Sequence, residues 1–167
     1  AFQSGRDRFL QEAKILARNA HVTELVRVHH YFAENSTAYM VMEYVQGITL
    51  REYIARRGGR MPYRETLALL RPVVTALGSI HRDGLIHRNI GPDSIVMLRG
   101  GGVKLLDFGS GRVMSRGGKS AAGRQGFAPV EQYQQNVALG PWTDVYALCA
   151  TLYYCVTGQV PPDATQR

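Results

Sequence analysis

The segment from Val145 to Val156 restricts the possible folds most, because every residue in it except Thr151 is apolar or aromatic. Pro141 before it and Gly158 after it are typical boundaries of a helix. A helix with no polar face is expected to be buried on all sides. Its two cysteines, Cys149 and Cys155, have no partners at metal-site spacing and are expected to be core residues.

Length and composition indicate one globular domain. The chain has 167 residues, 45% of them hydrophobic, which is enough for a sizeable core. Its net charge is +7, but the basic residues are scattered and have no interleaved aromatic residues, which argues against a nucleic-acid surface. The sequence contains neither a long apolar run nor a signal-peptide pattern. We therefore expect a cytoplasmic protein that binds neither nucleic acid nor membrane through this segment, with a basic surface compatible with an acidic partner.

The rest of the chain alternates helix and strand patterns, which predicts an α+β fold. Helices are predicted at 6–19, within 48–59, and from Pro62 to about Asp83. The apolar face of the third is assigned to Leu67, Leu70, Val74, Leu77 and Ile80. Two β-rich runs within 24–44 flank a polar turn, Glu34-Asn35-Ser36, and predict a hairpin. Runs at 94–98 and 103–108 predict two more strands around a glycine turn.

A candidate functional loop lies in "HRDGLIHRNIGPDSI", residues 81–95, which contains two similar triplets. The first ends in Asp83, where a short acid before a glycine is common at the end of a helix. The second, His87-Arg88-Asn89, is followed by Pro92, by Ser94, by a predicted strand and by Asp-Phe-Gly at 107–109. We therefore assign the second triplet to the candidate working loop.

This order resembles the protein kinases, whose catalytic loop, H-R-D-x-x-x-x-N, precedes D-F-G and A-P-E. These sequence motifs most resemble those of the bacterial serine/threonine kinases. "FLQEAKIL" resembles the regulatory helix, with Glu12 as its acid. "YMVMEYVQGITL" resembles the strand that enters the hinge, with Met42, Glu43 and Val45. The resemblance implies that these three residues, with Glu12 and Asp107, are cofactor-binding positions. "GFAPVEQY" resembles the end of the activation segment, and "WTDVYALC" opens a match to the central large-lobe helix.

The resemblance implies a truncated protein-kinase-like fold in a single partial domain, 1–167. Residues 1–44 are expected to be a small-lobe remnant, 45–48 the hinge, and 49–167 the large-lobe portion. The family's Gly-rich loop and Lys strand precede "FLQEA", and further helices follow "VPP"; this sequence contains neither.

Several positions depart from the family pattern in this candidate site. Asn89 stands where the family has the proton-accepting Asp, and an amide cannot take up a proton at neutral pH. Gly91 stands in the Lys slot, and Arg124 in the Thr slot that bonds to that Asp and Lys. Ser94 replaces the Asn that holds a second Mg²⁺. Arg88 of the triplet and the metal-binding Asp107 are retained.

The other matching residues imply structural roles. His87, Phe108 and Leu16 occupy positions that stack in the family's hydrophobic spine. Asp144 would cap the backbone of the catalytic loop from the central helix, and Glu131 occupies the acid of A-P-E.

Two functions remain open on this evidence. The first is a pseudokinase that acts as a scaffold or regulator through a protein partner and binds neither ATP nor Mg²⁺ tightly. The second is a fragment of an active bacterial serine/threonine kinase, which would transfer the γ-phosphate of ATP to protein hydroxyls. A small-molecule phosphotransferase is a third reading, which "DFG" and "APVE" disfavour. The apolar helix also predicts a homodimer.

Overall fold

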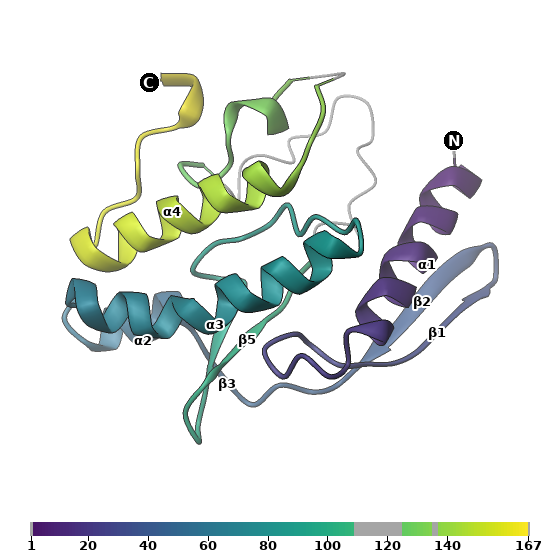
Figure 1. The fold of residues 1–167 in the computed structure, drawn as a ribbon, viewed down its shortest axis with the longest axis horizontal. Helices are drawn as coiled ribbons and strands as arrows, with labels where there is room; N and C mark the ends of the chain where they lie inside the picture. Colours follow the sequence, from purple (N-terminus) through teal and green to yellow (C-terminus); the bar gives the residue numbers. More distant parts are fainter. Residues whose placement is uncertain (1, 109–124, 135–136, 167) are drawn as a thin grey trace.

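Helix α1 lies beside a two-stranded hairpin, and α3 lies beside α4 (Figure 1). Short connections link most of the elements along the chain. The computed structural model describes residues 2–108, 125–134 and 137–166. The elements are α1 (Phe2–Arg18), β1 (Val28–Glu34), β2 (Thr37–Met42), β3 (Gly47–Thr49), α2 (Leu50–Arg56), α3 (Tyr63–Arg82), β4 (Ile95–Leu98), β5 (Val103–Leu105), the 3-10 turn η2 (Val130–Gln132), α4 (Pro141–Thr157) and the 3-10 turn η3 (Ala164–Gln166). The α+β class is confirmed.

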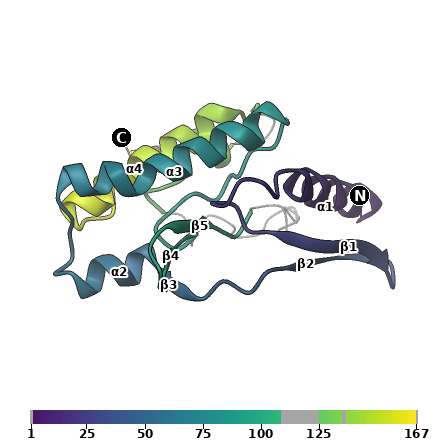
Figure 2. The ribbon, with the colours of Figure 1, turned by 60° about the horizontal axis from the view of Figure 1, so that its bottom comes forward.

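The predicted hairpin is confirmed as the antiparallel pair β1–β2. Its register brings Glu34 opposite Thr37, so Asn35 and Ser36 alone form the turn. Both have positive φ, 50° and 59°, as a two-residue turn that matches the strand twist requires. Helix α1 lies across one face of the hairpin (Figure 2) and buries Leu16 in the core.

A second sheet, in the order β3–β4–β5, is antiparallel, and β5 also forms a parallel bridge between Leu105 and Leu25, in the segment that precedes the hairpin. The Leu105 N–H donates to the Glu24 carbonyl at 2.7 Å, and the Val26 N–H donates to the Leu105 carbonyl at 3.2 Å. The short strand β3 was missed because its three residues run directly into α2. Thr49, its last residue, caps α2 in a capping box with Glu52.

Helix α3 packs against α4 and β5, but the predicted apolar face was wrong at two positions. Leu67 is 39% exposed and Val74 is 53% exposed. The buried stripe instead contains Thr66, Leu70, Val73, Ala76, Leu77, Ser79 and Ile80. Because successive residues of a helix are about 100° apart, Leu67 and Val74 project to the side of that stripe.

Helix α4 has the predicted ends, but only one face of it is buried. Gly158 ends it with φ of 75°, and a Cβ there would lie 2.5 Å from the Gly59 carbonyl oxygen, so only glycine fits. Val145 and Tyr153 are 54% and 43% exposed, which corrects the expectation of burial on all sides. The residues of α4 that are buried, among them Ala147, Thr151 and Cys155, lie on one side of the helix by their spacing, and α3 is its helical neighbour.

The two cysteines of α4 differ, and the core assignment was wrong for one of them. Cys155 is fully buried, and its burial raises the pKa of the thiol to about 12. Cys149 is exposed, because it lies on the uncovered face of the helix. None of the helices described is both long and apolar enough to span a membrane.

The assignment of the α3 faces is tested by one substitution made at two positions. Leu70→Ala, at a site only 3% exposed, should lower the free energy of unfolding by about 2–5 kcal/mol, because it leaves a cavity in the core. Leu67→Ala should cost less than about 1 kcal/mol, because that side chain already meets water. Urea unfolding measures both, and equal losses would contradict this face assignment.

Candidate functional site

The predicted working loop is held by a carboxylate from another element, Asp144 in the first turn of α4. Asp144 has no exposed surface. Its Oδ2 accepts the His87 N–H at 2.8 Å, and its Oδ1 accepts the Arg88 N–H at 2.7 Å. His81 Nε2 lies 2.8 Å from Oδ2. Arg88 has a φ of 62°, so the carboxylate holds the loop where its backbone is in the left-handed region.

The ring of His87 joins the loop to the end of β5. It is fully buried, 4.3 Å from the ring of Phe108 between centroids. Its Nε2 lies 2.9 Å from the Leu106 carbonyl, and the Asn89 N–H donates to its Nδ1 at 3.2 Å. A carbonyl only accepts, so Nε2 carries the proton and the ring is a neutral structural element.

Asn89 acts as a hydrogen-bond donor in this loop. Its Nδ2 donates to the backbone carbonyl of Asp107 at 2.8 Å. Asp107 has a φ of 58°, and the bond ties this left-handed residue to the loop. A carboxylate in place of the amide would bring a second acceptor against the carbonyl. The contact therefore uses the property that distinguishes Asn from Asp.

Ser94 and Gly91 form a closed turn with each other. The Gly91 N–H donates to Ser94 Oγ at 3.0 Å, and Ser94 Oγ donates to the Gly91 carbonyl at 3.1 Å. Ser94 is only 3% exposed. Its hydroxyl is thus occupied within the turn and is poorly placed to bind a metal ion.

The side chains predicted to hold Mg²⁺ offer one carboxylate, that of Asp107, and one hydroxyl that is already hydrogen-bonded. Nowhere in the described ranges do three His, Cys, Asp or Glu side chains gather as metal ligands would. Mg²⁺ prefers octahedral oxygen ligation, usually with one or two carboxylates. With Ser94 occupied, Asp107 is the one predicted metal ligand whose side chain is still available.

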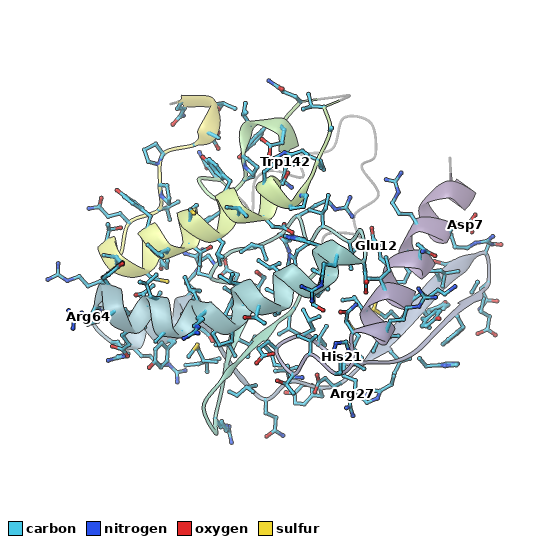
Figure 3. All side chains as sticks on the ribbon, in the orientation of Figure 1. Asp7, Glu12, His21, Arg27, Arg64 and Trp142 are labelled. Carbon is cyan, nitrogen blue, oxygen red and sulfur yellow. The ribbon has the colours of Figure 1, made fainter. Side chains whose placement is uncertain are left out.

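Glu12 of α1 pairs with the loop, which the sequence analysis did not predict. Figure 3 shows Glu12 on α1. Its Oε1 accepts a hydrogen bond from Arg88 Nη2 at 2.8 Å. The residue is 6% exposed, and no donor among the described residues reaches its Oε2. Burial raises the pKa of this carboxyl, and this effect exceeds the lowering by the positive charges of Arg88 and Arg8.

Arg88 also contacts the segment that follows the undescribed stretch. Gln132 Nε2 donates to the Arg88 carbonyl at 2.9 Å. Glu131, the acid of the A-P-E match, accepts the Thr143 hydroxyl at 3.0 Å and so joins η2 to α4. Arg124 lies outside the described residues.

The segment that leads into the expected hinge carries an ion pair. Glu43 pairs with Lys104 of β5 and accepts the Arg27 N–H at 2.7 Å. Partial burial opposes ionisation of Glu43, but these donors outweigh it and lower the pKa of the carboxyl. Met42 is 46% exposed, and Val45 is half-buried. The carboxylate of Glu43 thus joins the residue after β2 to β5 and to the residue before β1.

A second feature that the sequence did not indicate is Arg51, at the start of α2. Its guanidinium bonds both carboxylate oxygens of Asp93, at 2.6 and 2.8 Å, which raises its pKa. The guanidinium carbon lies 5.0 Å from the ring centre of Tyr154 and 5.9 Å from that of Phe127. Arg51 and Phe127 line a cavity of about 460 Å³ together with Gln125, Val160, Pro161, Pro162, Asp163 and Gln166.

A family model described as "Protein kinase domain" matches residues 2–167. The chain belongs to the protein kinase family. It is 35% identical to "Serine/threonine-protein kinase PknL" of Mycobacterium tuberculosis over 158 residues, covering 92% of this chain and 39% of that protein. It is 32% identical to "Serine/threonine-protein kinase PrkC" of Bacillus subtilis, covering 93% of this chain and 24% of that protein.

Solved structures share the fold. "PpkA-294 apo form" is 36% identical, with a TM-score of 0.75, and the match covers 99% of this chain and 58% of that one. The "PknI kinase domain" of Mycobacterium tuberculosis is 28% identical, with a TM-score of 0.76, and the match covers 96% and 60%. The resemblance to bacterial serine/threonine kinases and the kinase-like α+β fold are confirmed, and the match covers part of each relative. The chain spans less than two fifths of the length of PknL and PrkC.

The buried carboxyl of Glu12 predicts a specific pH dependence. Its pKa is raised in the fold above the ordinary 4.5, so protonated Glu12 favours folding. That contribution is complete below about pH 4.5 and is lost as the pH rises through the raised value. Glu12→Gln keeps an acceptor for Arg88 but cannot ionise. We expect the variant to gain stability relative to the parent chain as the pH rises from about 4 to 7.

Urea unfolding at several pH values measures this difference. Glu34→Gln, at an exposed position in the hairpin, is the matched control for loss of one carboxylate. A Glu12→Gln variant that instead loses stability relative to the parent as the pH rises would show that the ion pair with Arg88 outweighs burial.

Proposed function

We propose that this chain is part of a pseudokinase, a kinase-family domain that serves as a scaffold or regulatory module and transfers no phosphate. The observation that carries the proposal is the hydrogen bond from Asn89 Nδ2 to the Asp107 carbonyl. The position that would accept the substrate's proton holds a donor, and that donor is already engaged. General-base catalysis needs an acceptor of suitable pKa within reach of the proton.

The neighbouring positions support the same proposal. Gly91 supplies no charge to the transferring phosphoryl group, and the Ser94 hydroxyl is occupied within its own turn. Phosphoryl transfer depends mostly on positioning and electrostatic stabilisation. The family uses ATP and Mg²⁺, but with Asp107 as the remaining predicted metal ligand we expect no tight binding of either. The expected cytoplasmic location belongs to this proposal as well.

The alternative function is a portion of an active serine/threonine kinase. The observation that favours it is the similarity to PknL and PrkC, both of which are named as serine/threonine-protein kinases. In that case Asn89 would be tolerated, and ATP would donate its γ-phosphate to protein hydroxyls. Arg88, Asp107 and Glu12 match the family in either case, so they do not separate the two functions.

The two functions differ in a phosphate-transfer assay. The chain, incubated with radiolabelled ATP, Mg²⁺ and generic protein acceptors, should leave no label above a boiled control. Asn89→Asp alone should not restore transfer, because the changes at Gly91 and Ser94 remain. Nor should ATP with Mg²⁺ raise the melting temperature by several degrees.

Mg²⁺-dependent labelling that disappears in Asp107→Ala would overturn the pseudokinase proposal. If the natural gene encodes a longer protein, the same assay on that protein tests the alternative directly. Label that requires Asp107 there would establish an active kinase.

We also propose that the partner includes a second copy of the chain, bound through the exposed face of α4. Trp142, Val145 and Tyr153 are 57%, 54% and 43% exposed on this helix. Covering large apolar side chains contributes about 1.5–3 kcal/mol each. A two-fold dimer would pair this face with its own copy.

Light scattering over a range of concentrations tests the dimer. We expect a dimer that dissociates in Val145→Asp and Tyr153→Asp, because each places a charge in the interface. Val74→Asp, at an exposed position on α3, is the matched control and should leave the dimer intact. A folded monomer at high micromolar concentration would refute this proposal.

A further inference from the structure

The outer face of α3 carries an exposed apolar stripe that the core does not use. It contains Tyr63, Leu67 and Val74, which are 59%, 39% and 53% exposed. Their spacings of four and seven residues place them on one side of the helix. The periodicity that suggested a core position for Leu67 and Val74 is therefore real, but it belongs to a second face.

A basic stripe runs beside this apolar one. Arg64, Arg71 and Arg82 are all exposed, and their spacings of seven and eleven residues also keep them on one side of the helix. None of them forms an ion pair with a described residue. The one acid within α3 is Glu65, and it pairs with Arg57.

The apolar stripe lies beside the buried face of α3, and the basic stripe lies farther round the helix, on the side away from that face. The buried face of α3 packs on α4 and β5, and Figure 2 shows α3 and α4 together in a layer that covers the strands β3–β5. Arg64 lies at one end of the helix, at the edge of the molecule (Figure 3).

We propose that the outer face of α3 is a docking surface for an acidic amphipathic helix of a partner protein. An apolar stripe on the partner would pack on Tyr63, Leu67 and Val74. Carboxylates seven residues apart on that helix would meet Arg64 and Arg71, because seven residues span about 10.5 Å in both helices. Unpaired arginines on a chain of net charge +7 select for an acidic partner and speed its association.

The arrangement favours a protein helix over an anionic membrane. A helix that lies in a membrane surface uses a broad apolar face that sinks about 5–10 Å into the bilayer. Here the apolar stripe is a single row of three side chains along the helix, and the arginines lie on one side of this row only. Such an edge-to-edge pattern suits a second helix laid alongside. This proposal holds whether or not the chain transfers phosphate.

The test uses a fluorescent synthetic helical peptide with Glu at positions seven apart beside a leucine stripe. A peptide of the same composition in scrambled order is its control. Fluorescence anisotropy with the chain should show saturable binding of the patterned peptide, at least tenfold tighter than of the scrambled one. Arg64→Glu with Arg71→Glu should weaken that binding at least tenfold, and so should Leu67→Ser with Val74→Ser.

The matched control is Arg18→Glu with Arg99→Glu, which changes the net charge equally at exposed positions outside α3. It should change the affinity by less than twofold. Equal binding of both peptides, no binding up to about 100 µM, or equal loss in the control would overturn the proposal. So would binding to phosphatidylserine vesicles that is lost in the α3 variants while the patterned peptide does not bind.

Discussion

The buried carboxylate of Asp144 is the interaction on which the rest of the site depends. It accepts the backbone N–H groups of His87 and Arg88 and contacts His81, so one side chain joins α4, α3 and the loop. A charge without exposed surface is stable only when its hydrogen bonds are satisfied. The loop and the start of α4 therefore hold each other in place.

From this anchor, contacts extend outward through the loop residues. His87 reaches the Leu106 carbonyl and the Phe108 ring, and Arg88 reaches Glu12 of α1. None of these contacts requires a proton acceptor at residue 89. The kinase architecture can thus persist when the catalytic position changes, and Asn89 even adds a hydrogen bond to Asp107 that an Asp could not donate.

Local patterns in the sequence predicted the helices, the hairpin and the position of the loop, because turn and cap chemistry is local. These patterns failed where contacts between distant segments determine which residues are buried and which side chains pair. Helical periodicity alone could not tell which of two apolar stripes on α3 faces the core, so Leu67 was misplaced. Nor could it show Cys149 on an uncovered face. The pairs Glu12–Arg88 and Arg51–Asp93 join elements far apart in the chain, and no spacing rule connects such residues.

The way β5 bonds the segment before the hairpin has a consequence for the kinetics of folding. The Asn35-Ser36 turn and helix α3 can form early, since their contacts are local. Lys104 of β5, however, bonds the Leu25 carbonyl across 79 residues of sequence. Closing so long a loop costs chain entropy before any contact repays it. The hairpin should consequently dock onto the helical half late, and the open edge of β5 would be the site most prone to mispairing until it does.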